Sequence, residues 1–302
     1  MKTFFSSFIL AFFAFSLMAQ SPVNLKLNLD KGKTYKIKTT SKQAIQQTVN
    51  GQSYALDVYS NSVVSYKVLK QENDVMDIEF KFDTIATKIV SPMFNKETNS
   101  AKPAGNEPVE KIMNKMSTFK LIAKISTAGK FVDFVNFAKF KDSVMFVIDS
   151  IPGSKRDDAR KLAEGLLKET AVKSMIEPLF AYLPDKAVKV GDTWETSYFN
   201  TSNNISLVLL NSYTLKGMEN NQATVSGQAE MESMPSNDPS AQTSQELKGT
   251  STFDCTLDIK TGLLLKSTSK GNFEGATIMN NNGKETRIPM KVDSQSETIM
   301  TK

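Results

Sequence analysis

The stretch VMDIEFKF, residues 75–82, alternates apolar and charged side chains with a period of two. Because successive side chains of a β-strand point to opposite faces, this alternation predicts a strand with one apolar face and one charged face. The segment before it, residues 54–68, alternates in the same way, and a polar turn at residues 71–74 separates the two. Alternating segments joined by short turns are typical of an antiparallel sheet with one solvated face.

The period of two continues on both sides of this stretch. Towards the N-terminus, residues 23–29 alternate, and Asn50-Gly51 predicts a two-residue hairpin. Residues 92–108 are rich in Asn, Lys, Pro and Glu, which predicts an exposed loop. Further strands are expected near residues 193–200, 204–216, 222–234, 247–260, 262–279 and 285–300. The pattern as a whole predicts about eleven strands.

The centre of the chain, residues 133–183, changes to a helical period. Apolar side chains recur there three or four residues apart, which is the spacing of an amphipathic helix. This stripe has two interpretations: it fills the space beneath a curved sheet, or it lines a cavity for an acyl chain or a similar apolar ligand. The candidate ligand-binding residues are Phe134, Phe137, Phe140, Val144 and Ile148.

Together these patterns predict an α+β protein built on one large antiparallel sheet. Long strands with one apolar face must cover that face, and the central helices are the available cover. We therefore expect a curved, half-barrel-like sheet wrapped on a central helical block, in a single domain over residues 20–302. The alternative is two sheet halves, residues 23–132 and 188–302, hinged by the helices.

The N-terminus predicts export. Lys2 precedes a short, mostly apolar run over residues 4–18, and a small residue, Ala19, follows. This arrangement is typical of a secretory signal peptide at residues 1–19, cleaved after Ala19. The apolar run is too short to be a convincing membrane span, so we expect a periplasmic or secreted protein with no membrane span after cleavage.

The composition excludes much catalytic chemistry. The chain has no histidine and one cysteine, Cys255, so catalysis by Ser-His or Cys-His pairs and structural zinc sites with several cysteines are excluded. Asp77 and Glu79 share the charged face of one strand, which we interpret as a solvated face. Basic residues are not clustered into a stripe, so no nucleic-acid partner is expected. We predict no enzyme activity, no catalytic residues, no metal and no cofactor, and we interpret Cys255 as a buried thiol.

One stretch carries a resemblance. The run LPDKAVKVGDTW, residues 183–194, resembles a run found in uncharacterised secreted β-rich proteins of Gram-negative bacteria, a family of unknown function. The predicted topology is also similar to the half-barrels of periplasmic lipoprotein carriers. This second resemblance implies helices against a concave sheet face and an apolar cavity that holds acyl chains.

Two hypotheses for function follow. The first is a non-enzymatic exported protein that binds an apolar small molecule or lipid between sheet and helices. The second is a structural or interaction component of the cell envelope, whose sheet surface or edge strands contact an envelope protein.

Overall fold

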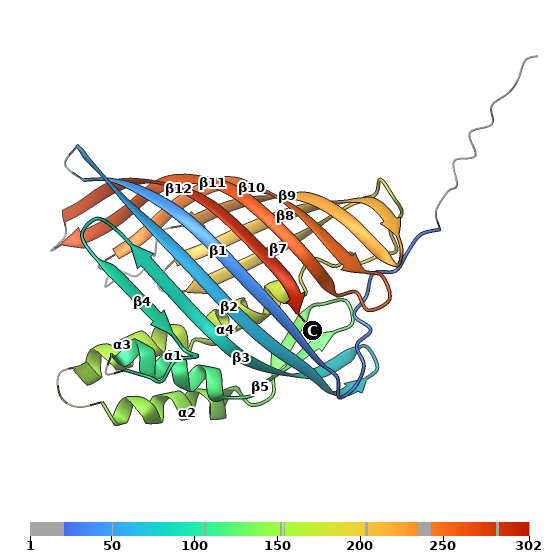
Figure 1. The fold of residues 1–302 in the computed structure, drawn as a ribbon, viewed down its shortest axis with the longest axis horizontal. Helices are drawn as coiled ribbons and strands as arrows, with labels where there is room; N and C mark the ends of the chain where they lie inside the picture. Colours follow the sequence, from blue (N-terminus) through green and yellow to red (C-terminus); the bar gives the residue numbers. More distant parts are fainter. Residues whose placement is uncertain are drawn as a thin grey trace, which may run out of the picture.

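One curved antiparallel sheet of twelve strands dominates the structure, a computed structural model that describes residues 21–301 except 50, 106, 152, 154, 203–204, 235–242 and 282–283 (Figure 1). The α+β class and the large curved sheet are confirmed. The predicted signal peptide, residues 1–19, lies outside the described residues.

The strands are β1 (Thr34–Val49), β2 (Gln52–Glu72), β3 (Val75–Val90), β4 (Asn95–Asn99), β5 (Leu121–Ser126), β6 (Phe131–Phe134), β7 (Thr193–Ser202), β8 (Ile205–Glu219), β9 (Gln222–Met234), β10 (Thr243–Asp258), β11 (Leu264–Asn281) and β12 (Lys284–Thr301). The helices are α1 (Pro108–Thr118), α2 (Phe137–Asp149), α3 (Lys155–Leu166) and α4 (Glu169–Ile176), and a short 3-10 helix, Glu177–Leu179, follows α4.

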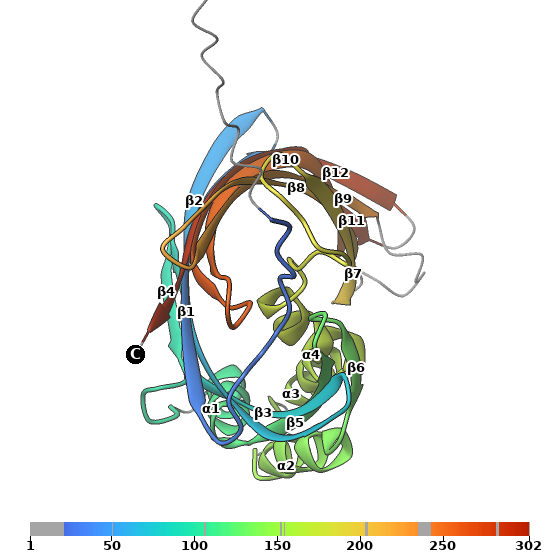
Figure 2. The same cartoon turned by 90° about the vertical axis from the view of Figure 1, so that its right-hand side faces the viewer.

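The strand order explains how the helices complete the fold. The order is β6-β5-β3-β2-β1-β12-β11-β10-β9-β8-β7, with β4 paired to the far end of β3. The two end strands, β6 and β7, follow each other in the chain and are joined through α2, α3 and α4. Figure 2 shows α4 between β7 and β6, whereas α2 lies beyond β5 at the bottom of the view. Helices α1 and α2 contact β3, β4 and β5, whereas α4 contacts β7.

The centre of the sheet joins the two ends of the described chain. Strand β1 pairs with β12 from Lys36–Thr301 to Gln47–Met290. On its other side, β1 pairs with β2 through the predicted hairpin, in which Val49 pairs with Gln52. The two-residue turn expected at Asn50-Gly51 is therefore confirmed by the register, although Asn50 itself lies outside the described residues.

Two predicted boundaries were wrong. Residues 92–108 contain the strand β4 within the expected loop. Its sequence NKETN has no apolar alternation because a short strand at the margin of a sheet can remain solvated. Phe134 ends β6 rather than lying in the helical stripe, because its backbone pairs with Ala123 of β5. Helix α2 begins at Phe137, and spacing alone could not separate the two segments.

Residues 23–29 were expected to form a strand but lie outside the sheet. Their alternation is real, because Leu25, Leu27 and Leu29 are buried while their neighbours are exposed. The segment is extended, and within the described residues it forms one isolated bridge, between Val23 and Val188. Figure 2 shows it crossing the inside of the curved sheet. We refer to residues 23–29 as the plug.

Replacing Phe140 by aspartate tests whether α2 is docked. The side chain of Phe140 is fully buried, so Phe140→Asp places an unpaired charge in the core and should lower the free energy of unfolding by more than about 3 kcal/mol. Phe146 on the same helix is 77% exposed, so Phe146→Asp is the matched control and should unfold close to wild type. Urea denaturation compares the two; equal stabilities would show that α2 is not packed as described.

Candidate functional site

The predicted ligand-lining residues gather in a packed cluster of aromatic rings. The Phe131, Phe134 and Phe137 rings form a continuous series, with centroid distances of 4.7 Å and 5.1 Å. Phe140 continues it at 6.2 Å from Phe137 and meets Phe119 at 5.3 Å.

The rest of the predicted set is equally enclosed. Val144 and Ile148 are fully buried on the same face of α2 as Phe140, and this helix packs on α1 and α3. The structure therefore brings all five predicted residues together at one margin of the sheet. Their role in ligand binding stays a prediction.

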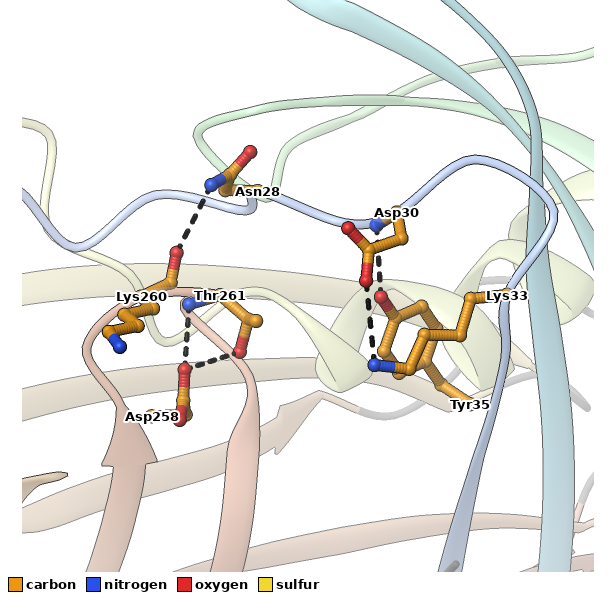
Figure 3. A network of polar contacts seen from close by, with 7 residues as sticks. All are labelled: Asn28, Asp30, Lys33, Tyr35, Asp258, Lys260 and Thr261. Carbon is orange, nitrogen blue, oxygen red and sulfur yellow. Dashed lines mark hydrogen bonds and ion pairs between the residues drawn. The ribbon is translucent and has the colours of Figure 1, made fainter. Parts of the chain in front are cut away.

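The plug closes one end of the concave side of the sheet. Its backbone is held by two turns that are distant in the sequence: the Leu27 N–H donates to the Thr127 carbonyl at 2.7 Å, and the Asn28 N–H donates to the Thr261 carbonyl at 3.0 Å. The Asn28 side chain also donates to the Lys260 carbonyl at 3.4 Å (Figure 3). Beyond the plug, the Asp30 N–H donates to the Tyr35 hydroxyl at 3.0 Å.

Tyr182 forms hydrogen bonds at the same turn between β10 and β11 that contacts the plug. Its hydroxyl donates to the Gly262 carbonyl at 3.0 Å and accepts from the Leu264 N–H at 2.9 Å. Its own carbonyl accepts from the Trp194 indole N–H at 3.0 Å. Complete burial raises the pKa of Tyr182 well above its usual value, which keeps the phenol neutral and available as a donor. This end of the concave side is thus sealed by satisfied polar groups and leucine side chains.

The open remainder of the concave face carries a continuous apolar row. Alternation along each strand and the register between strands together fix which side chains line up. The row crosses β7, β8, β9, β10, β11, β12, β1 and β2 at Tyr198, Leu209, Met231, Gly249, Phe273, Val292, Ile45 and Leu56. We call these residues the apolar row. Sequence reasoning missed it because each strand contributes one residue and only the register joins them.

Charge is absent from this face. Apart from the turn between β11 and β12, none of the described concave side chains of β1–β3 and β7–β12 is Asp, Glu, Lys or Arg. The charged residues of these strands lie on the outer face, where they form cross-strand ion pairs. Examples are Lys42–Asp57 at 3.1 Å, Lys266–Glu297 at 3.1 Å and Lys291–Glu274 at 3.0 Å.

Two hollows are found among the described residues at the outer face. The larger, about 570 Å³, lies over β8–β11 and includes Val208, Leu210, Glu232 and Lys248. A smaller one of about 330 Å³ adjoins it and shares Leu210. Leu210 is 51% exposed and Phe199 on the neighbouring strand is 59% exposed, which gives this outer surface an apolar patch. No described group of three or more His, Cys, Asp or Glu residues is arranged to hold a metal ion.

Cys255 lies on the concave side and is buried, as predicted from the sequence. Burial raises the pKa of the thiol from 9.0 to about 12, and burial likewise raises the pKa of the nearby Tyr213 from 10.0 to about 12. Both groups therefore stay protonated in the folded chain at neutral pH. A thiol held in this form is a poor nucleophile and packs as a small apolar side chain.

The fold and this face define the class: a curved antiparallel sheet with helices between its ends and an uncharged concave face. Residues 73–264 match DUF6263, a family of unknown function, and the chain belongs to that family. The expected membership of an unknown-function β-rich family is confirmed. No curated protein matches the chain. Among the helices of the described residues, none combines the length and the hydropathy that a membrane-spanning segment needs.

Solved structures with similar chains are distant. A structure of lipovitellin described for its lipid–protein interactions aligns with 91% of this chain and 26% of its own, at 9% identity and a TM-score of 0.46, so this chain spans about a quarter of it. An outer membrane channel from Pseudomonas putida F1 aligns over 91% and 97% of the two chains, at 10% identity and a TM-score of 0.26. A protein described as exported, with a YmcC-like fold, from Bacteroides fragilis NCTC 9343 aligns over 92% and 100%, at 10% identity and a TM-score of 0.23.

Gly262 permits the turn between β10 and β11 to approach the plug, and its substitution tests that contact. The residue has a φ of +69°, and a Cβ there would overlap the carbonyl oxygen of Lys26. Gly32 also has a positive φ, of +82°, but faces open space. Gly32→Ala should cost about 1–2 kcal/mol through backbone strain, and Gly262→Ala should cost distinctly more. Equal losses in urea unfolding would contradict a close contact at the plug.

The buried thiol gives a prediction for pH. The unfolded chain releases the Cys255 proton near pH 9, whereas the raised pKa of about 12 keeps it bound in the fold. The contribution of the protonated Cys255 thiol to the free energy of unfolding is therefore fully present below pH 9 and is lost as the pH rises towards 12. Urea denaturation at pH 8 and pH 10.5 should show this loss, and Cys255→Ala should show a smaller one. A thiol reagent should label the native protein at pH 8 far more slowly than the unfolded chain; equal rates would exclude burial.

Proposed function

We propose that this protein is a non-catalytic, exported binding protein that holds an apolar chain, such as the acyl chain of a lipid, against the concave face of its sheet. The single observation that carries the proposal is the uncharged concave face with its apolar row. The absence of histidine from the sequence supports a non-catalytic role, and the predicted signal peptide supports export.

The distribution of charge favours an apolar occupant. Lys, Arg, Asp and Glu make up 23% of the chain, yet the described concave positions of nine strands contain none outside the β11–β12 turn. A charge on this face would need a partner once a ligand covered it, and an apolar chain supplies none. Contact with the row would instead contribute roughly 0.8 kcal/mol for each methylene removed from water.

The apolar row retains surface for such a ligand. The helices make their principal sheet contacts with β3, β4, β5 and β7. Tyr198 is the row residue on β7, and the other seven row residues lie on β8–β12, β1 and β2. Leu209, Met231, Phe273, Ile45 and Leu56 are half-buried, although the core residues nearer the plug are fully enclosed. A chain lying across these side chains would complete their burial.

A second function is supported by the outer face. Leu210 and Phe199 are exposed beside the two hollows, and β7 ends the sheet. Exposed apolar side chains next to an end strand are suited to contact with another protein. This observation supports the alternative of an envelope protein as partner, on the side of the sheet away from the proposed ligand.

Two adjacent leucines on β8 separate these functions. Leu209 lies in the apolar row, whereas Leu210 faces outward. With the neutral apolar fluorophore N-phenyl-1-naphthylamine as probe, the wild-type protein should raise its fluorescence. Leu209→Lys should weaken binding about tenfold or more, because the lysine would put an unpaired charge against the probe. Leu210→Lys is the matched control and should bind like wild type, with thermal melting confirming that both variants fold.

The result that overturns the proposal is equally clear. Absence of binding to the wild-type protein, or equal binding by the two folded lysine variants, would exclude the concave face as a site for apolar chains. If Leu210→Lys alone weakens fluorophore binding, the binding site lies on the outer face instead.

A further inference from the structure

The concave face is not apolar throughout. Along β1, the inward side chains are Ile37 in the core, then Thr39, Ser41 and Gln43, and then Ile45 in the apolar row. The polar positions therefore lie between the plugged end and the apolar row. At about 3.4 Å per residue, the path from Ile37 to Ile45 is roughly 27 Å long.

The register extends these polar positions across four central strands. One row joins Ser267, Thr298, Thr39 and Ser62, and the next joins Ser269, Ser296, Ser41 and Ser60. We call these eight residues the hydroxyl band. All eight are half-buried, whereas the outward residues between them, Thr268 on β11 and Glu297 on β12, are exposed.

Half of the band is not satisfied by the protein. Thr39 and Thr298 share a hydrogen bond of 3.0 Å between their hydroxyl oxygens, and Ser269 and Ser296 share one of 2.8 Å. Among the described residues, no side-chain hydrogen-bond partner is found for the remaining four, and each can donate one bond and accept two. These residues are Ser41, Ser60, Ser62 and Ser267.

A plain core would not need this band. Two residues closer to the plug, the same strands present Ile37 and Val64, and further out they present Ile45 and Leu56. Half-buried hydroxyls between two apolar regions must find partners in water or in a ligand. Outside the β11–β12 turn, none of the described side chains on this face is charged, so a charged ligand group would have no counter-ion beside the band.

We infer that the ligand is an uncharged amphiphile, with a hydroxyl-bearing head such as glycerol or a sugar on the hydroxyl band and its apolar chain along the apolar row. This inference rests on the proposed function and names the class of ligand. The plug closes the band from one side, so the head lies towards the plug and the chain lies on the far side of the band, across the strands on the apolar row.

Competition between lipids tests the head group. Monooleoylglycerol and oleate have the same chain and differ in head group, so each is titrated against bound N-phenyl-1-naphthylamine at pH 8. The neutral ester should displace the fluorophore at a concentration at least tenfold lower than the carboxylate. Equal potency, or a preference for oleate, would overturn an uncharged head.

Variants of the hydroxyl band test whether the head group binds there. Ser41→Ala/Ser60→Ala removes two unpartnered hydroxyls and should weaken displacement by monooleoylglycerol about tenfold, while leaving direct binding of the fluorophore unchanged. Thr39→Val/Thr298→Val, which conserves side-chain shape, should act in the same direction. Thr40→Val/Thr268→Val alters the outward positions of β1 and β11 and is the matched control, expected to change neither measurement.

The outcomes distinguish failure of the proposed function from failure of the proposed head-group site. If the fluorophore does not bind, or if Leu209→Lys leaves its binding unchanged, the proposed function fails. If the fluorophore binds, but monooleoylglycerol displaces it from the band variants as easily as from the wild-type protein, the apolar site stands and the proposed head-group site is wrong.

Discussion

The alternation of side chains along a strand is the constraint on which this structure depends. Each strand has two faces, and outside the β11–β12 turn the described charged residues of nine strands occupy the same one. Charged side chains need water or a partner, so they set the outer face of the sheet. The Lys42–Asp57 and Lys291–Glu274 ion pairs lie there. The direction of curvature follows, because the face without charge is the one that can turn inward and cover itself.

A curved sheet still has two end strands, and in this chain the helical segment connects them. Strands β6 and β7 are the ends of the sheet and are joined through α2, α3 and α4, so the helices arise where the gap has to be covered. The Tyr198 hydroxyl on β7 donates to the Ser174 carbonyl of α4 at 3.1 Å, and Phe180 beyond α4 packs edge-on against Tyr66 of β2. At the same time, β1 pairs with β12 along a full ladder. The fold is therefore closed at its middle by strand pairing and at its ends by helices.

The sequence predicted the parts of this fold that are local. Strand β9 is the clearest case, since residues 222–234 alternate cleanly and form the strand with those bounds. Prediction failed where tertiary context decided. The plug alternates like a strand, yet its backbone bonds to turns at Thr127 and Thr261 rather than to a neighbouring strand. Strand β4 has no apolar pattern, and its place is set by pairing with β3 and contact with α1.

The candidate site was hidden from the sequence for a related reason. Aromatic density drew attention to Phe134, Phe137 and Phe140, which are adjacent in the chain and pack together. The apolar row and the hydroxyl band are instead assembled from residues up to hundreds of positions apart, as in the pair Thr39–Thr298. Period-two alternation assigns each side chain to a face, but only the register between strands says which of them lie side by side.

The same residues that line the concave face also bend it. A Cβ on Gly249 would lie 2.7 Å from the Phe273 ring, and a Cβ on Gly271 would lie 2.8 Å from the same ring. The ring thus lies over two glycines and replaces the side chains they lack, which lets neighbouring strands bend without leaving a void. Phe273 is half-buried and belongs to the apolar row. The Phe273 ring therefore both fills the space above the two glycines and lines the concave face, so the ligand proposed above would contact the ring that lets these strands bend.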